Sequence, residues 1–205
     1  DFLKSNSLSR KQLKNEQLDE NSIFNIHYGD IHSSFNYEVL DLKKESVLPK
    51  VVGNHLIKSE TDYLKDGDLV MADASEDYDG ICDCVELKNV HNVKLVSGLH
   101  TFALRDKGRN FINGFKSYLF KNENVVKSIY RVVTGISVLG ISKSNLSKIR
   151  IPIPPLSEQQ RISLILSDWD TAIENIQTLI EKLRLRKKGL MQQLLSGRSR
   201  FPSFS

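Results

Sequence analysis

The 205-residue sequence is poor in several residue types: it has two cysteines, two methionines, one tryptophan and five prolines. Cys82 and Cys84 cannot form a disulfide framework, and without a second pair of ligands they do not match a zinc site. We expect both to be small core residues in a reducing cytoplasm. No apolar run approaches the roughly 20 residues that a membrane span needs, so we expect no membrane partner.

Catalytic and cofactor-binding motifs are also missing from the sequence. It has no GxGxxG, P-loop, HExxH or GxSxG pattern. The string "IPIPP" lacks the Asn or Asp of a proline-rich methyltransferase signature. The acidic stretch from Asp66 to Glu86 does not form a calcium loop, because Tyr78 stands where the loop needs glycine. The sequence therefore predicts no catalysis, metal or cofactor for this chain, and a solvated hairpin for the acidic stretch.

Residues 1–155 predict a mixed α/β (α+β) globular domain, which is large enough for one core. Ser9 and Gln12 stand at capping-box spacing and predict a helix over residues 10–18. The other expected elements follow from turn signals and periodicity. They are a strand over 23–31 ending in a turn at Gly29–Asp30, mainly loops over 32–58, a hairpin of 66–75 with 80–87, a strand pair over 93–105 broken by Gly98, one or two helices over 110–133, and short strands within 137–142 and 148–154.

Three of the five prolines stand together in "IPIPPLSEQQR" (151–161), where the pattern changes. Pro152, Pro154 and Pro155 forbid a continuing helix and predict a stiff joint. Ser157, with Gln160 three residues later, predicts the N-cap of a long helix, and Gly197 predicts its end. At 1.5 Å per residue this helix is roughly 57 Å long. The second domain is therefore expected over residues 156–205.

Apolar residues recur along this helix at alternating spacings of four and three, which is typical of a coiled coil. We call them the seam; they are Ile162, Leu166, Trp169, Ile173, Ile176, Ile180, Leu183, Leu190 and Leu194, with Lys187 at one further seam position. Leaving them in water forgoes on the order of 15–25 kcal/mol. Residues 1–150 offer no second heptad run, so we expect the partner helix to come from a second copy or from a missing part of the protein.

The net charge of +4 and a pI of about 9.0 are compatible with nucleic acid as a partner. Cationic and polar residues near strand ends are the candidates for DNA contact. The candidates are Lys43, Lys44, Arg105, Lys107, Arg109, Lys116, Thr134 and Ser137. Each group taken alone is more typical of a solvated protein surface. An alternative function, a scaffold that assembles proteins through the coiled coil without reading DNA, therefore stays open.

The strings "IHYGDI", "VSGLHTFALR", "IPIPPLSEQQRISLIL" and "KKGLMQQLLSG" resemble the specificity subunit of type I restriction-modification enzymes. That resemblance implies a target recognition domain that reads one half of a bipartite double-stranded DNA site, and a long helix that spaces two such domains. It implies no catalysis in this subunit. The implied partners are modification subunits, which bring S-adenosylmethionine, and a restriction subunit. The outer helix face with Glu174, Gln177 and Glu181 is the expected dock for the modification subunit.

The chain departs from the family pattern because it has one globular domain and one long helix, roughly half a subunit. It begins with Asp1 rather than Met, and we expect either an excised half or a natural half-subunit that pairs with itself. In both cases the seam needs a second helix.

Overall fold

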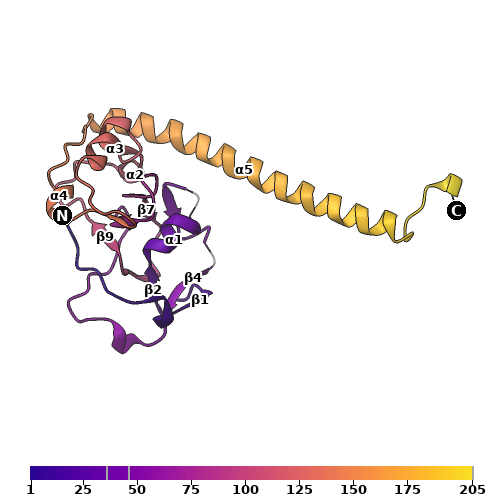
Figure 1. Cartoon of the computed structure of the whole chain (residues 1–205), viewed down its shortest axis with the longest axis horizontal. Coiled ribbons are helices and arrows are strands. Elements are labelled where there is room, and N and C mark those ends of the chain that lie inside the picture. The colour runs from indigo at the N-terminus through magenta and orange to yellow at the C-terminus, as the bar shows by residue number, and fades with distance from the viewer. Residues whose placement is uncertain (36, 46, 205) are drawn as a thin grey trace. The chain divides into compact units, whose positions relative to one another are not determined.

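The computed structural model describes residues 1–35, 37–45 and 47–204 (Figure 1). The chain forms two compact units, residues 1–163, which we call the head, and residues 164–205. The head is a mixed α+β domain, and a long helix follows the prolines, as the sequence predicts.

The described strands of the head form three β-sheets. A four-stranded sheet has the order β1-β4-β2-β8, a second has the order β3-β7-β5-β9, and β10 pairs with β6. Two neighbouring pairs, β2 with β8 and β3 with β7, are parallel, and the others are antiparallel. The strands are β1 (Leu13–Gln17), β2 (Ile23–Ile26), β3 (Val39–Asp41), β4 (Val47–Val51), β5 (Leu69–Ala72), β6 (Ala74–Ser75), β7 (Cys84–Lys88), β8 (Lys94–Ser97), β9 (Thr101–Leu104) and β10 (Leu139–Gly140).

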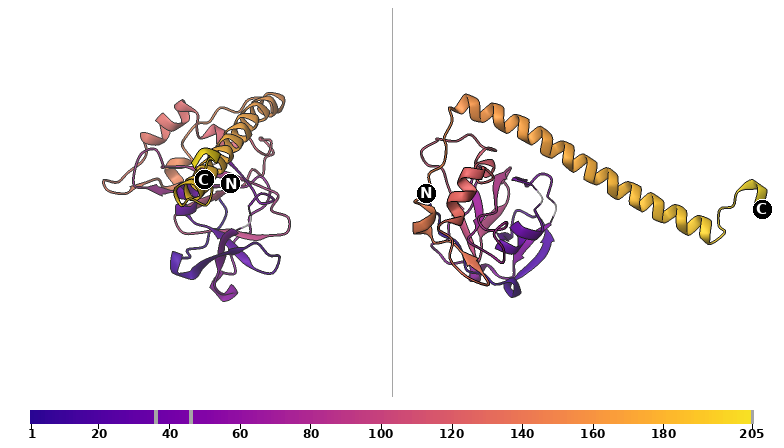
Figure 2. Two further views of the ribbon diagram at one scale, coloured as in Figure 1. Left: turned by 90° about the vertical axis from the view of Figure 1, so that its right-hand side faces the viewer. Right: turned by 45° about the horizontal axis from the view of Figure 1, so that its top comes forward.

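Strand β5 shows why this arrangement suits the sequence. Side chains alternate along a strand, and in "LVMA" both faces are apolar and buried. Val70 joins the core that contains residues of both four-stranded sheets. Met71 packs in a second core, which also includes Val125 and Ile129 of α3 (Glu123–Tyr130). The sheet β3-β7-β5-β9 is therefore covered on both sides, and Figure 2 shows the strands of the head with the helices beside them.

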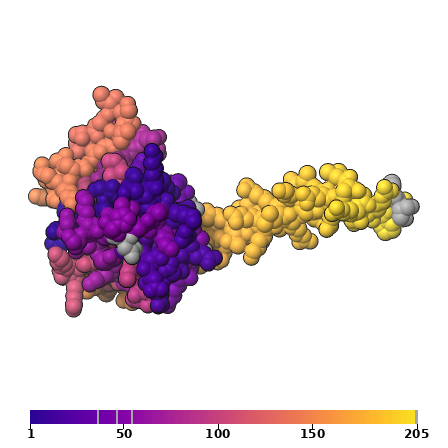
Figure 3. Space-filling model, turned by 90° about the horizontal axis from the view of Figure 1, so that it is seen from below, coloured from indigo at the N-terminus to yellow at the C-terminus, as the bar shows by residue number. Residues whose placement is uncertain are grey.

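The remaining helices of the head are short: α1 (Tyr28–Ser33), α2 (Lys116–Leu119), α4 (Lys143–Leu146), and the 3-10 turns η1 (Arg10–Gln12) and η2 (Asn54–Leu56). Helices α2 and α3 confirm the two helices expected over 110–133. In the view of Figure 3, atoms from the N-terminal half of the chain supply most of the visible surface of the head.

Several predicted elements are wrong, and tertiary pairing explains most of the differences. The capping box of Ser9 and Gln12 is present, but it caps only η1, and β1 then pairs with β4. The segment with Gly29 and Asp30 is helix α1 instead of a turn. Strands β3 and β4 lie where loops were expected over 32–58, a range in which residues 36 and 46 lie outside the described residues.

Two further corrections concern strands. The expectation that the hairpin of β5 with β7 is solvated is wrong, because both strands are buried and the Asp68 and Glu86 carboxylates are buried with them. The pairing of β5 with β7 as a hairpin is confirmed. In contrast, β8 and β9 do not pair with each other, because the turn at Gly98–His100, with His100 at φ 54°, carries the chain from one sheet to the other. No strand forms over 148–154, and α4 was missed.

Helix α5 runs from Leu156 to Leu195 without interruption, 40 residues or about 60 Å (Figure 2). Its first carbonyl acceptor is Pro155, which receives hydrogen bonds from the amides of Glu158 and Gln159 at 2.9 and 3.0 Å. Ser157 therefore lies inside the first turn, and its prediction as N-cap is wrong. Gly197, at φ 72°, follows the last turn as predicted, and the 3-10 turn η3 (Pro202–Phe204) comes after it.

Candidate nucleic-acid interface

The start of α5 is anchored in the head by one buried glutamine. Gln159 has no exposed surface and is the single buried residue of α5. Its Oε1 accepts a hydrogen bond from the Ile112 amide at 3.0 Å. Its Nε2 donates to the carbonyls of Asn110 and Pro154, both at 2.9 Å. The side chain thus uses both donors and an acceptor, and Ser163 adds a hydrogen bond to the Gly114 carbonyl at 2.5 Å.

The loop that hydrogen-bonds to Gln159, residues 110–114, is also bound by Glu86 of β7. This carboxylate accepts from the amides of Gly114 and Lys116 at 2.7 and 2.8 Å, and pairs with the Lys116 ammonium at 2.6 Å. Both side chains are buried, with 0% and 9% of their surface exposed. Lys116 was a candidate for DNA contact. The structure contradicts this assignment, because the Lys116 ammonium is buried and paired with the Glu86 carboxylate inside the head.

Arg105 has a similar internal role. Its guanidinium makes a bidentate pair with Asp68, at 2.8 and 2.6 Å, and donates to the Tyr63 carbonyl at 2.9 Å. The hydrogen bonds to Asp68 raise the pKa of Arg105. Because the guanidinium donors of Arg105 already bind the buried Asp68 carboxylate, Arg105 is not included in the proposed DNA interface.

Four other basic candidates lie on exposed loops. Lys107 and Arg109 stand in the segment after β9, where the Asp106 carboxylate accepts from the amides of Gly108 and Phe111 at 3.1 and 2.9 Å. Lys43 and Lys44 follow β3 and are also exposed. The structure keeps these two groups in separate loops.

Thr134 and Ser137 belong to a hairpin loop that the strand pairing holds at its base. Thr134 and Gly140 exchange backbone hydrogen bonds of 3.0 and 2.8 Å. Gly135 has φ 128°, and a Cβ added there would stand 2.0 Å from the Val138 carbonyl oxygen, so only glycine fits. Both candidates are exposed, and they remain predictions.

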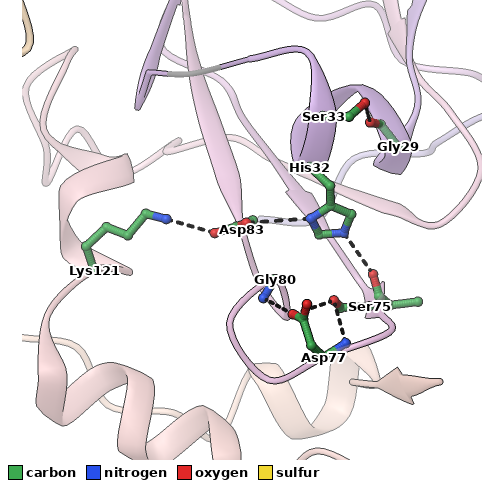
Figure 4. A network of polar contacts seen from close by, with 9 residues as sticks. Gly29, His32, Ser33, Ser75, Asp77, Gly80, Asp83 and Lys121 are labelled. Carbon is green, nitrogen blue, oxygen red and sulfur yellow. Dashed lines mark hydrogen bonds and ion pairs between the residues drawn. The ribbon is translucent and has the colours of Figure 1, made fainter. Parts of the chain in front are cut away.

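A polar network joins α1, the residue directly before β7 and the link between α2 and α3 (Figure 4). His32 Nδ1 lies 3.5 Å from the Asp83 carboxylate, and its Nε2 lies 3.2 Å from the Ala74 carbonyl. Lys121 approaches the same carboxylate at 2.8 Å. The hydrogen bond to Asp83 raises the pKa of His32 despite its burial. Burial alone would raise the pKa of Asp83, but the bonds from His32 and Lys121 hold it below its usual value. The contacts tie three elements together, which indicates a structural role.

The two cysteines are buried and unpaired, as expected. Burial raises the pKa of Cys82 to about 12 and that of Cys84 well above its ordinary value. Thiols held protonated in this way are poor nucleophiles. Among residues 1–35, 37–45 and 47–204, no three His, Cys, Asp or Glu side chains gather where they could hold a metal ion. Nor does any helix in that part of the chain have the length and apolarity to cross a membrane.

Beyond the head, α5 carries an uncovered apolar surface. Trp169 is 67% exposed, and the seam residues from Ile173 to Leu194 are exposed as well. Ile162 and Leu166, near the head, are partly buried. Further large apolar side chains, including Ile165 and Leu179, widen this face. Monomeric proteins rarely expose a continuous face of this kind.

Two solved structures of restriction-modification subunits share this fold over part of their length. The S subunit of a type I restriction-modification system from M. genitalium has a TM-score of 0.57 and 16% identity, over 96% of this chain and 43% of that chain. The HsdS subunit from Thermoanaerobacter tengcongensis has a TM-score of 0.54 and 17% identity, over 94% and 48%. At these identities the likeness establishes the fold.

Sequence comparison carries the assignment further. Residues 85–185 match the family described as "Type I restriction modification DNA specificity domain". Two relatives come from Methanocaldococcus jannaschii. The putative type I restriction enzyme MjaX specificity subunit is 34% identical over 105 residues, 50% of this chain and 24% of the relative. The type I restriction enzyme MjaVIII specificity subunit is 39% identical over 80 residues, 38% of this chain and 19% of the relative.

Residues 85–185 thus match the type I restriction-modification DNA specificity domain, and this match together with the two relatives confirms the resemblance in the sequence. A specificity domain is a recognition module, in agreement with the prediction that the chain is no enzyme. The chain spans only about a quarter or less of these two relatives and less than half of the two solved subunits.

Proposed function

We propose that this chain is a non-catalytic half of a type I specificity subunit. In this proposal the head reads one half of a bipartite target on double-stranded DNA, and α5 pairs with a second helix that carries another head. The observation that carries the proposal is the match to the specificity domain, because it runs from the head into α5, together with the uncovered seam.

Charge favours an antiparallel partner for α5. Residues 164–180 contain three carboxylates and no Lys or Arg. Residues 181–195 contain five cations against Glu181 alone, and the cations are Lys182, Arg184, Arg186, Lys187 and Lys188. Two copies paired antiparallel place acidic halves opposite basic halves, whereas parallel pairing aligns like charges. This charge pattern is matched by a second copy of α5, and equally by a missing helix that has an acidic half and a basic half in the same order.

The length of α5 supports a spacing role. At about 60 Å it is longer than one turn of DNA, roughly 34–36 Å. Two heads at opposite ends of a helix pair would contact half-sites separated by more than one turn. Modification subunits that use S-adenosylmethionine, and a restriction subunit, are the proposed partners. The proposed docking face for the modification subunit is the outer surface with Glu174, Gln177 and Glu181. Such a complex would work in the cytoplasm and needs no cofactor in this chain.

A selection from duplexes with randomised sequence tests the reading role. The full chain is expected to enrich a split sequence with a fixed spacer between its halves. Steep loss of affinity with added salt is expected, because phosphate contacts release counterions. Absence of any enriched sequence, together with salt-independent or undetectable DNA binding, would refute the proposal. It would favour the alternative scaffold that binds proteins alone.

A further inference from the structure

A hollow of about 410 Å³ opens on the head where four stretches of chain meet. They are the N-terminal segment 4–7, residues 58–60, the turn 98–102 and Lys143 at the start of α4. The N-terminus, β9 and α4 lie close together in Figure 1. None of the DNA-binding candidates drawn from the sequence lines this hollow.

The lining carries an excess of positive charge. Lys4, Lys58 and Lys143 all contribute to it, and none of the three has an ion-pair partner among the described residues. Among the described residues of the lining, Glu60 is the one carboxylate. The Asp62 carboxylate lies beside the hollow and accepts a hydrogen bond from the Lys4 amide at 2.9 Å. The nearby Asp73 carboxylate is engaged by His100 at 3.3 Å. Three cations against one carboxylate leave a surface that attracts an anion.

One of these cations is held in place before any ligand arrives. The Lys143 ammonium stands 5.2 Å from the ring centroid of Phe2 and 5.9 Å from that of Phe102. Attraction to two aromatic faces orients the charge without neutralising it. Beside it, the Ser5 hydroxyl donates to the Thr101 carbonyl at 3.2 Å, which fixes the N-terminal segment against the turn. An ordered cation loses less conformational entropy on binding.

We propose that this hollow binds phosphate oxyanions of the DNA backbone, with Lys4, Lys58 and Lys143 as the contacting cations. The inference rests on the proposed function, since it assigns a binding surface to the DNA-reading head. Lysine ammonium groups contact phosphates as point charges and carry no sequence information. The hollow would therefore set the position of the head on the duplex, while base reading falls to other loops. Its polar, open character also argues against a small organic cofactor, which favours apolar clefts.

Fluorescence anisotropy with a duplex of about two helical turns, titrated between about 50 and 200 mM salt, tests the assignment. The test variant of the full chain is Lys4→Ala/Lys58→Ala/Lys143→Ala. The matched control removes the same charge from three exposed lysines outside the hollow, Lys11→Ala/Lys65→Ala/Lys94→Ala. Removing a lysine that contacts a phosphate lowers the salt slope by about one. We expect the slope to fall by about three in the test variant and to stay close to the wild-type value in the control.

The outcomes separate the two proposals. If the wild-type chain binds DNA and both triple variants keep its slope, the hollow is not the phosphate site, although the proposed function stands. If the wild type binds no DNA, both proposals fail. Thermal unfolding in inorganic phosphate against chloride at equal ionic strength distinguishes the source of the anion. The hollow is a site for free anions if phosphate raises the melting temperature only when the three lysines are present, while the triple variant keeps the wild-type salt slope of DNA binding. That result overturns the DNA assignment. Lys4→Ala/Lys58→Ala, which leaves the contacts of Lys143 intact, controls for folding, with an expected fall in slope of about two.

Discussion

Replacing Gln159 with alanine should destabilise the head, although most of the helix that carries it is exposed. The substitution removes three hydrogen bonds, and the Ile112 amide and the Asn110 and Pro154 carbonyls lose the partner that satisfies them. Buried groups left without partners cost about 1–3 kcal/mol each before relaxation and water entry. We expect a loss of about 2–4 kcal/mol in the free energy of unfolding. For a domain of this size that lowers the melting temperature by roughly 5–15 °C.

Gln160 provides the matched control, because it is the same residue one position later and is exposed. Gln160→Ala is expected to change stability by less than about 0.5 kcal/mol. Gln159→Glu separates hydrogen bonding from packing, since it keeps the size but removes both amide donors. Circular dichroism on heating measures all three variants. If the melting temperature of Gln159→Ala equals those of the wild type and of Gln160→Ala, Gln159 does not anchor the helix to the head.

Three further variants test other named interactions. The folded-state pKa of His32 is raised, so its stabilising contribution is complete below the unfolded pKa of about 6.5 and is lost as pH rises through the folded pKa. His32→Gln should therefore lower the free energy of unfolding, measured by chemical denaturation, more at about pH 5.5 than at about pH 8.5. An equal loss at both pH values would contradict this. Lys116→Met leaves Glu86 buried without its cation and should lower the free energy of unfolding in urea by about 3–5 kcal/mol. Adding Glu86→Gln should recover part of this loss, and no recovery would mean that the unpaired charge is not its cause. Leu183→Asp should prevent self-association in light scattering across a dilution series and leave the head's melting unchanged, whereas Asn175→Asp, which adds the same charge away from the seam, should associate like the wild type.

The long helix and its joint could be predicted from the sequence because their signals are local. Prolines fix the backbone directly, and a heptad pattern over about 30 residues that is broken only at Lys187 has few alternative interpretations. Strand pairing in the head depends on contacts between distant segments instead. Nothing near Gly98 indicates that β8 joins β2 while β9 joins β5. Likewise, Pro49 and Lys50 make β4 look like a loop until β1 supplies its partner.

The candidate interface was harder to predict for the same reason. A lysine in a sequence does not reveal whether a carboxylate from another strand meets it, as Glu86 meets Lys116. The converse holds for Lys4, Lys58 and Lys143, which lie far apart in the sequence and line one hollow. Gln159 stands beside the glutamine expected to cap the helix, and its burial depends on the loop at 110–114. Two local signals were overlooked: the capping box between His27 and Asp30 that begins α1, and the Ser142 side chain that caps α4.

The identity of the partner helix also constrains the DNA that the complete reader recognises. If a second copy of this chain covers the seam, the two heads are identical and related by a two-fold axis. The two halves of the target must then be the same sequence in inverted orientation. If a missing half with its own head covers the seam, nothing requires the two half-sites to agree. A selected target that is an inverted repeat, found together with a dimeric mass, thus indicates self-pairing. An asymmetric target bound by a dimer of this chain would contradict the two-head arrangement itself.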